Sequence, residues 1–537
     1  MKNIKQNILL ELEKKGIPDL EFLFSKEVLD VSQELLEEML EEEKNIFREK
    51  LKIKDKDINF SVFDDFSMLD YFFSLLYHLF YVRDNEQIRA IINSFEPKYI
   101  DFGNEISFSK RYYEMMKICM KNNDLNSDQK RILELNIKSY EVKGINLEPE
   151  KQERLKVINK KLSKISTDFG NNELDNEKDF SYNIESDEFL KELPKDVLLS
   201  AKKTAEENGK KGYIFDLSYT NYSSIMKYCS DKNIRKDFYE YRSSLCHGGS
   251  FDNRNNVLQI LTLRQEKAEL LGYKNHAEMS LEFRMAESPE IVISMLEDIA
   301  KKGKIKAISE INELKKFFNL ESIEIFDVGY YLTKYKKIKY NLDDKIVRQY
   351  FEFENTLSSM FDILKKLFGL EMKDVTDSIL GKEKRGLMKD VRFYEVYRNN
   401  KLISYFIGDY FYDKRKKGEA WCNVIRDKFS STLPVVVNMC NFQKTDDGLC
   451  LLTLNDAETL FHEFGHAMHN MFTKSPYGEL LGTNIERDFV ELPSQIMENW
   501  VKDVNSINLI AKHYQTGEKL DKEIINVIEK LKYLQTG

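Results

Sequence analysis

The stretch "TLFHEFGHAMHNMF", residues 459–472, holds three of the seven histidines of the chain. At about 100° per residue, a helix through it gathers four polar side chains on one narrow arc: Glu458, His462, His466 and His469. The opposite side of this helix is apolar and consists of Leu460, Phe464, Ala467, Met468 and Met471. The pattern predicts a helix that buries its apolar side and presents the histidines to a cleft.

The start of this helix is predicted from its capping residues. Asn455 can act as an N-cap, and Glu458 follows three residues later. This pair resembles a capping box, in which two side chains satisfy free backbone N–H groups reciprocally. We therefore expect Asn455 to be the N-cap of this helix.

The spacing of His462 and His466 is that of an H-E-x-x-H metal site. One helical turn separates the two histidines, so both imidazoles can reach one ion. Two histidines and a third ligand hold zinc and leave a coordination position open for water. Glu463 can accept a proton from the activated water and pass it to a leaving amine. We predict one zinc ion, with His469 as a bystander two turns from His462.

The third ligand must come from elsewhere in the chain. The metzincin signature requires a glycine where His469 stands and a third histidine where Phe472 stands, so that class is excluded. A later carboxylate is needed, and the candidates are Glu479, Glu486, Glu491 and Glu498. Glu486 lies 20 residues after His466, which is the thermolysin-like interval, and Glu491 lies 25 after it. Spacing alone leaves this choice open.

The composition of the whole chain favours long amphipathic helices. Its 537 residues are 42% hydrophobic and 32% charged, with only 8 prolines and 22 glycines. This length exceeds what one compact core usually holds, so we expect two or more packed units. Helical periodicity covers residues 1–160 and 195–380, and a polar interval near 168–190 is expected to be a loop.

Strand-like sequence appears only toward the histidine helix. Residues 390–412, "DVRFYEVYRNNKLISYFIGDYFY", are rich in β-branched and aromatic residues around a turn-like Arg398-Asn399-Asn400. This pattern predicts a hairpin, and "LPVVVNMCNF" at 433–442 predicts a further strand. A small β-sheet beside the histidine helix is the expected result.

Charge and hydropathy exclude several classes of protein. The net charge of −9 argues against a dedicated nucleic-acid binder. Six scattered cysteines without a CxxC pair indicate reduced thiols. No apolar run approaches the roughly 18 residues of a membrane span, and the N-terminus does not resemble a signal peptide. We expect a cytoplasmic protein without nucleic-acid or membrane partners.

Two motifs together resemble the thimet oligopeptidase family of zinc metallopeptidases, which includes oligopeptidase A and the dipeptidyl carboxypeptidases. They are "LFHEFGHAMH" at 460–469 and "DFVELPSQIMENW" at 488–500. Four further stretches support the resemblance: 263–279, 347–370, 390–396 and 416–421. The resemblance implies that Glu491 is the third zinc ligand, and that the enzyme hydrolyses short peptides as a metalloendopeptidase or oligopeptidase.

The resemblance also implies a fold. It is mainly α and zincin-like, with a small β-sheet beside the active-site helix and a deep substrate channel. We expect an N-terminal helical region at 1–325 and a catalytic zinc-peptidase region at 326–537. Metal-bound histidines usually donate their second N–H to a carboxylate or carbonyl. Glu458 and Asp488 are candidates for this supporting role, although capping explains Glu458 equally well.

One departure from the family lies in "KRKKGEAW", where Glu419 replaces the second of two glycines. The run of Lys and Arg beside it fits a solvated loop or a basic rim that steers peptide carboxylates. The family's chain also continues past Gly537, into a tyrosine-bearing segment that stabilises the oxyanion. No such cluster follows Glu491, and the apolar stripe of the last helix has no later partner. The expectation is a C-terminally truncated chain.

Two alternatives to an active peptidase follow from these observations. The first is a zinc-binding but catalytically impaired protein that at most binds peptides, because removing one oxyanion donor costs roughly 10²–10³ in rate. The second is a purely helical scaffold in which the motif is accidental. Zinc content separates the scaffold from the other two, and turnover separates the peptidase from the impaired form.

Overall fold

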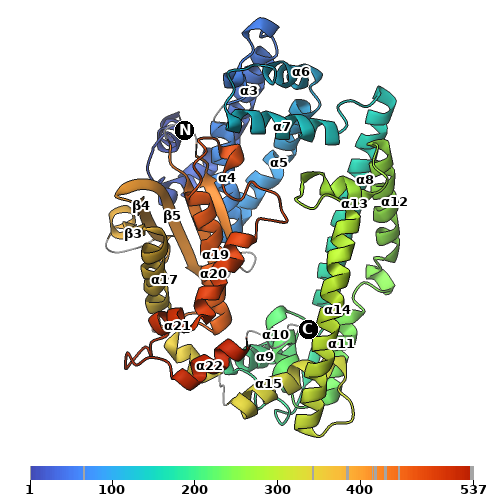
Figure 1. Cartoon of the computed structure of the whole chain (residues 1–537), viewed down its shortest axis with the longest axis vertical. Coiled ribbons are helices and arrows are strands. Elements are labelled where there is room, and N and C mark those ends of the chain that lie inside the picture. Colours follow the sequence, from blue (N-terminus) through green and yellow to red (C-terminus); the bar gives the residue numbers. More distant parts are fainter. Residues whose placement is uncertain are drawn as a thin grey trace. The chain divides into compact units, whose positions relative to one another are not determined.

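A computed structural model describes residues 2–64, 67–340, 344–381, 386, 388–413, 415–416, 420–428, 432–445 and 448–531 (Figure 1). The chain forms two compact units, each built from separate segments. Unit 1 comprises Met1–Asn146, Phe283–Met285 and Asp344–Ile525, and unit 2 comprises Leu147–Glu282, Ala286–Asp343 and Asn526–Gly537. The predicted division between 1–325 and 326–537 remains a prediction.

Unit 1 begins with seven helices: α1 (Lys2–Leu12), α2 (Leu20–Leu23), α3 (Lys26–Lys50), α4 (Met68–Val82), α5 (Glu86–Ser107), α6 (Lys110–Cys119) and α7 (Ser127–Val142). Polar caps start the longer ones. Ser67 accepts a hydrogen bond from the backbone N–H of Asp70 at the start of α4, and Asn85 does the same for Ile88 in α5. Helices α1 to α5 bury their apolar faces in one shared core.

A five-stranded sheet forms the centre of unit 1. Its strands are β3 (Leu370–Asp374), β4 (Arg392–Arg398), β5 (Lys401–Phe411), β6 (Trp421–Arg426) and β7 (Val435–Phe442), in the order β3-β4-β5-β7-β6. The β5–β7 pair is parallel, and the other pairs are antiparallel. Strands β4 and β5 form the predicted hairpin through Asn399 and Asn400, both with positive φ. The predicted strand at 433–442 is also confirmed as β7.

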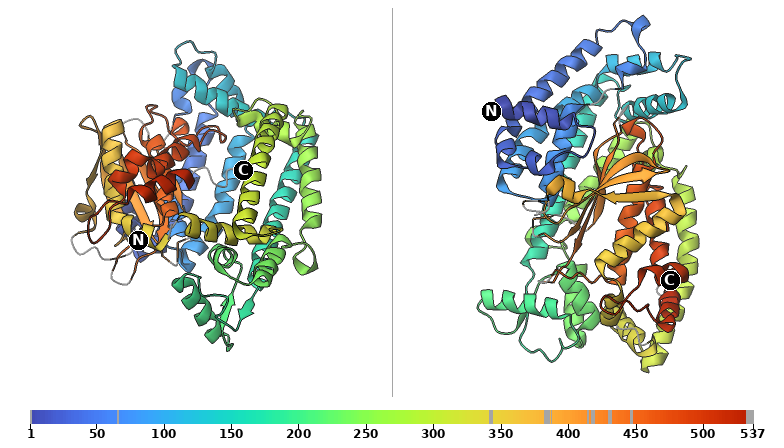
Figure 2. Two further views of the ribbon diagram at one scale, coloured as in Figure 1. Left: turned by 60° about the horizontal axis from the view of Figure 1, so that its bottom comes forward. Right: turned by 90° about the vertical axis from the view of Figure 1, so that its left-hand side faces the viewer.

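The two faces of this sheet are covered by different helices. Val435, Val437 and Met439 of β7 belong to the core shared with α1 to α5. The alternate residues of a strand point to the other face, where helix α19 (Leu454–Met471) packs. There the ring of Phe464 lies 5.1 Å from that of Phe406 on β5. The right-hand view of Figure 2 shows the sheet with helices on both sides.

The remaining helices of unit 1 are α16 (Asp344–Val347), α17 (Phe353–Phe368), α18 (Thr376–Leu380), α20 (Leu492–Lys502) and α21 (Val504–Ile510). Helix α17 lies on the same face of the sheet as α19, since Phe361 contacts both Tyr394 of β4 and Phe464. The last helix of the described residues is α22 (Lys522–Leu531), whose residues up to Ile525 belong to unit 1.

Unit 2 is helical apart from one strand pair, β1 (Tyr182–Ile184) with β2 (Tyr213–Phe215). Its helices are α8 (Pro149–Asp179), α9 (Lys195–Glu207), α10 (Tyr219–Tyr228), α11 (Lys232–Ser243), α12 (Arg254–Leu270), α13 (His276–Ser280), α14 (Pro289–Phe318) and α15 (Val328–Tyr340). The prediction of a loop near 168–190 is wrong for residues 168–179, because helix α8 continues to Asp179. Its polar side chains bond to neighbouring segments: Asn172 to Asn253, and Asn176 to Tyr241.

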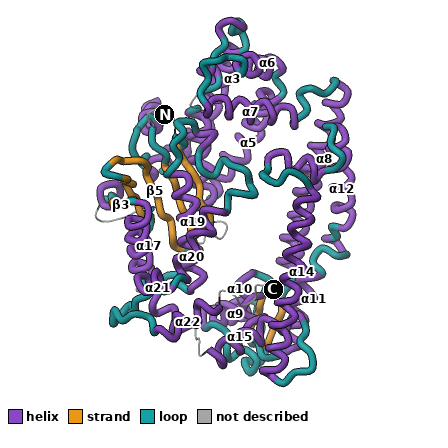
Figure 3. Tube along the Cα trace, in the orientation of Figure 1, coloured by secondary structure: helices purple, strands orange, loops and turns teal. Residues whose placement is uncertain are grey.

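The mainly α architecture with a small sheet beside the histidine helix is confirmed (Figure 3). Among the described residues, no helix has the length and apolar character needed to cross a membrane. All six cysteines carry free thiols. The predicted substrate channel remains a prediction, and Glu419 lies outside the described residues.

Candidate metal centre

Helix α19 carries the three histidines, and it begins earlier than predicted. The side chain of Thr453 accepts a hydrogen bond from the N–H of Asp456, and the Asp456 carboxylate accepts one from the N–H of Thr453. This capping box starts the helix at Leu454, so the predicted start at Asn455 with Glu458 is wrong. Glu458 is therefore free for another role. The five predicted apolar positions of α19 are all buried: Leu460, Phe464, Ala467, Met468 and Met471.

Helix α20 lies directly against α19, and Gly465 permits this close approach. A Cβ atom at Gly465 would lie 2.6 Å from Cα of Ser494 and 2.8 Å from the carbonyl oxygen of Pro493. Glycine within a helix normally costs about 1 kcal/mol relative to alanine. Here it lets the first turn of α20 sit on the backbone of α19. Glu491 is the N-cap residue of α20, so this contact sets the position of its side chain.

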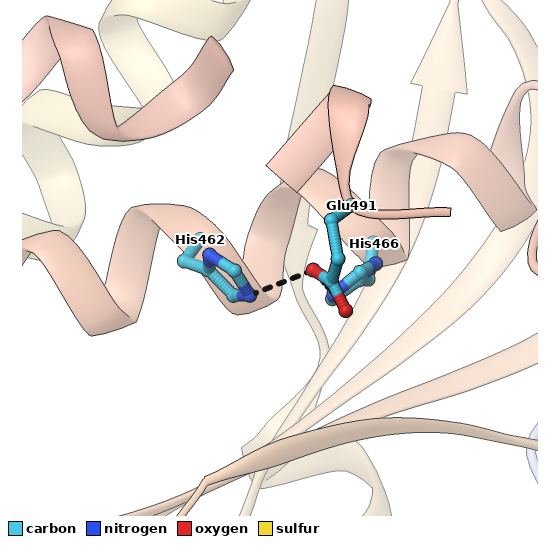
Figure 4. Close-up of side chains that lie close together, drawn as sticks. All are labelled: His462, His466 and Glu491. Atoms are coloured by element: carbon cyan, nitrogen blue, oxygen red, sulfur yellow. Dashed lines mark ion pairs between the residues drawn. The ribbon is translucent and has the colours of Figure 1, made fainter. Parts of the chain in front are cut away.

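His462, His466 and Glu491 come together at this helix pair (Figure 4). Oε2 of Glu491 lies 3.3 Å from Nε2 of His462 and 3.1 Å from Nε2 of His466. Around a tetrahedral zinc with bonds of about 2.0–2.2 Å, neighbouring ligand atoms are about 3.3–3.6 Å apart. Two imidazole nitrogens and one carboxylate oxygen also form a donor set used by catalytic zinc sites. The residues present therefore fit one zinc ion.

The other three glutamates considered as third ligand contact other groups. Glu479 accepts a hydrogen bond from Asn136, and Glu486 pairs with Arg131 at 3.0 Å. Oε1 of Glu498 lies 2.7 Å from Nδ1 of His462, on the far side of the ring from Glu491. His469 is not part of the group of possible metal ligands among the described residues. The geometry thus distinguishes Glu491 from the other candidates, which spacing could not do.

Glu498 supports His462, a role that the sequence analysis did not assign to it. A carboxylate at Nδ1 fixes the tautomer that leaves Nε2 unprotonated and available to a metal. Both residues expected in this role bond elsewhere: Glu458 pairs with Lys502 at 2.7 Å, and Asp488 accepts from the N–H of Met285. Glu498 follows Glu491 by seven residues, which is about two helical turns. This spacing, which places both side chains on one face of a helix, was the signal in the sequence that could have identified Glu498.

Glu463 lies beside the two histidines in a buried position, with 6% of its surface exposed. Its Oε2 atom has no hydrogen-bond partner among the described residues. Burial raises the pKa of this carboxyl group to about 7, and the nearby charge of His462 opposes the shift. A carboxyl group with a pKa near neutrality can both accept and return a proton, which is what general acid–base catalysis requires.

The two imidazoles of the group differ in their surroundings. Burial lowers the pKa of His466, which favours the neutral form that binds metals. Nδ1 of His466 has no hydrogen-bond partner among the described residues, whereas Nδ1 of His462 is paired with Glu498. Asn470 donates a hydrogen bond to the carbonyl oxygen of His466, one turn along the helix. His462 is therefore the more firmly oriented of the two.

Comparison with known proteins gives two matching family models. Residues 225–537 match the model described as peptidase family M3. Residues 34–152 match the N-terminal domain model of neurolysin and thimet oligopeptidase. The M3 match covers more than half of the chain and includes all four predicted site residues.

Three curated relatives align with most of the chain. It is 32% identical to oligopeptidase A of Haemophilus influenzae over 86% of this chain and 70% of the relative. It is 32% identical to a probable cytosolic oligopeptidase A of Arabidopsis thaliana, over 85% of this chain and 68% of the relative. It is 25% identical to the dipeptidyl carboxypeptidase of Salmonella typhimurium, over 86% of this chain and 69% of the relative.

Proposed function

The chain belongs to peptidase family M3 and is a metallopeptidase, and from this premise we propose that it hydrolyses short peptides with one zinc ion. His462, His466 and Glu491 hold the zinc, and Glu463 acts first as general base and then as general acid. The observation that carries this proposal is the meeting of three ligand atoms within 4.8 Å of one another, directly beside a buried carboxyl group.

Each side chain has a defined task in the proposed reaction. Zinc in such a site supplies a Lewis acid that activates water and polarises the peptide carbonyl. Glu463 takes the proton of the attacking water at its unpaired Oε2 atom and delivers it to the leaving amine. Glu498 holds His462 in the ligating tautomer. Ser494 donates a hydrogen bond of 2.8 Å to Oε2 of Glu491, which fixes the third proposed ligand.

The peptide itself can be held by the sheet. Strand β6 is an edge strand, and the sulfur of Cys422 on it lies 3.9 Å from Asn470 of α19. An extended peptide can add to such an edge through backbone hydrogen bonds. This mode suits short, unfolded peptides, because an extended chain exposes its backbone N–H and C=O groups for pairing. The cytoplasm is the proposed location, in keeping with six free thiols.

A comparison of two histidines on one helix tests the zinc site. His462→Ala removes a proposed ligand, and His469→Ala removes the histidine two turns away that the site does not use. Zinc per chain, measured by mass spectrometry, should fall at least tenfold in His462→Ala and stay near one in His469→Ala. Equal zinc in both variants would contradict the proposal. If the unmodified chain contains about one zinc but hydrolyses no peptide, the proposed peptidase activity is wrong. The alternative that remains is a zinc-binding protein that at most binds peptides.

A further inference from the structure

A cavity of about 480 Å³ lies in unit 1 between α4, α5 and the edge strand β6. Pockets that bind small ligands have volumes of roughly 300–1,000 Å³. Five of the lining side chains are aromatic: Phe73, Tyr77, Tyr81, Tyr99 and Trp421. The cavity is large enough for one side chain of a peptide, and its lining suits an aromatic one.

The aromatic wall is held in place before any ligand binds. The hydroxyl of Tyr77 donates to Glu96 and that of Tyr99 donates to Asp70, both at 2.7 Å. The ring of Phe73 packs 5.4 Å from Tyr77 and 5.0 Å from Tyr99. Since these rings are already ordered, binding against them costs little side-chain entropy.

One polar atom in the lining lacks a partner. His78 is 5% exposed, and its Nδ1 atom has no hydrogen-bond partner among the described residues. Burial lowers the pKa of His78 to about 4, so the ring is neutral near pH 7. The lining therefore combines aromatic rings with the neutral imidazole of His78 and with the carboxyl group of Asp70, which already accepts a hydrogen bond from Tyr99.

One residue that lines the cavity also contacts the helix that carries the proposed metal ligands. Cys422 lines the cavity, and its sulfur lies 3.9 Å from Nδ2 of Asn470. The same amide nitrogen donates to the carbonyl oxygen of His466 at 3.0 Å. Cys422 thus faces α19, while its neighbour Trp421 packs against the core of α1 to α5 on the other face of the sheet.

Strand β6 links the cavity to an extended peptide. It pairs only with β7 in the described sheet, so its other edge can accept a further strand. Side chains of a paired peptide alternate between the two faces of the sheet. Trp421 and Cys422 at the start of β6 both line the cavity. One side chain of a peptide paired with this part of β6 can enter it.

We propose that this cavity is a specificity site that binds one aromatic side chain of the peptide substrate, at a fixed position relative to the cleaved bond. The inference rests on the proposed function, because it concerns the peptide that the metal centre would hydrolyse. It assigns selectivity to α4 and β6, outside the proposed metal ligands and base.

Binding can be measured without turnover. The chain has two tryptophans, Trp421 and Trp500, so Trp500→Phe leaves Trp421 in the cavity as the only tryptophan whose emission is followed. Glu463→Gln is added to prevent cleavage. The probes are blocked alanine pentapeptides, one without phenylalanine and five with a single phenylalanine at successive positions. One position should bind at least about tenfold more tightly than the all-alanine peptide and change the Trp421 emission.

Two variants test whether the cavity causes this preference. Ser74 lines the cavity from α4, and Ser74→Phe would fill it; Tyr81→Ala would open its aromatic wall. Each should reduce the preference for phenylalanine about tenfold and leave the affinity for the all-alanine peptide within about twofold. Tyr219→Ala removes an equally large, 71% exposed tyrosine of α10 and serves as the matched control.

The outcomes separate the two proposals. Equal affinity for all six peptides would overturn the specificity site, as would a phenylalanine preference that survives both Ser74→Phe and Tyr81→Ala. Failure of the proposed function would give a different result: the chain without Glu463→Gln would cleave none of the peptides. The binding measurements would still show whether the cavity prefers phenylalanine. Cleavage of every peptide at the same kcat/KM would leave the hydrolase intact and remove the specificity site.

Discussion

Helices α19 and α14 are both long and amphipathic, but they differ in what they bury. Ten of the 18 residues of α19 are buried, among them Glu463 and Asn470. In the 30 residues of α14, only Leu314 is buried. Isoleucines such as Ile299 on α14 are more than half exposed, whereas Phe464 on α19 has no exposed surface. The same helical periodicity therefore accompanies two very different degrees of packing.

Sequence changes should therefore matter more in α19 than in α14. In α19 the apolar face fixes the helix against the sheet, and the polar face then presents the histidines at a set distance from α20. The residues that pack α19 and the residues proposed to bind zinc lie on the same helix. A substitution on either face of α19 should therefore affect the site. In α14, exposed positions have few contacts to lose. A change in α19 or in its partner can therefore be compared with a matched change outside the site.

The largest effect is expected from Glu463→Gln. The amide cannot accept the proton of the attacking water, and general acid–base catalysis is worth about 10²–10⁴ in rate. We expect kcat to fall by roughly this factor while zinc content and folding stay unchanged. The control is Glu297→Gln on the exposed side of α14, which should leave kcat within about twofold. Wild-type turnover in Glu463→Gln would remove the proposed base.

Phe464→Ala comes next, since it removes a fully buried ring that contacts Phe361 and Phe406. Truncation of a buried phenylalanine costs about 3–5 kcal/mol in the free energy of unfolding. The corresponding change on α14, Ile299→Ala, should stay within about 0.5 kcal/mol, because that side chain is 57% exposed. Urea unfolding of both variants measures the contrast. Equal losses would mean that exposure does not separate the two helices.

Gly465→Ala tests the approach of α20 to α19. The added Cβ would meet the backbone of Ser494 at 2.6 Å, and overpacking of this kind costs about 1–3 kcal/mol. Movement of α20 would also displace Glu491, so zinc affinity should fall with stability. Gly170→Ala in α8 is the matched control, as its Cβ would have no neighbour within 4 Å. That control should be neutral or stabilising by up to about 1 kcal/mol.

The smallest effect concerns the support of His462. Glu498→Ala removes the carboxylate at Nδ1, and loss of such a partner typically lowers metal affinity 10- to 100-fold. Glu458→Ala is the control, because Glu458 pairs with Lys502 instead and should change zinc affinity by less than threefold. Competition with a zinc chelator gives both affinities. A larger loss in Glu458→Ala than in Glu498→Ala would reverse the assignment.

The sequence predicted the elements of this region better than their contacts. Helical periodicity was sufficient to predict the buried face of α19. Turn residues between β-branched runs were sufficient to predict the β4–β5 hairpin. These features depend on neighbours in sequence. The role of Glu498 was missed because it depends on how α20 folds back over α19, and no local pattern encodes that contact.

The errors in the helix ends have the same origin. The polar stretch at 168–179 was expected to be a loop, but its asparagines bond to Asn253 and Tyr241, which lie far along the chain. Thr453 and Asn455 are both good N-caps by composition, and their backbone geometry decided between them. For the third ligand, spacing left Glu486 and Glu491 open, and only resemblance to a family favoured Glu491.

The central claim is that Glu491 completes the zinc site with His462 and His466. Zinc per chain, measured by mass spectrometry in Glu491→Gln and in Glu486→Gln, tests it most directly, because both variants make the same chemical change within one short segment. We expect at least a tenfold loss of zinc in Glu491→Gln and about one zinc per chain in Glu486→Gln. Full zinc in Glu491→Gln, or its loss in Glu486→Gln, would contradict it.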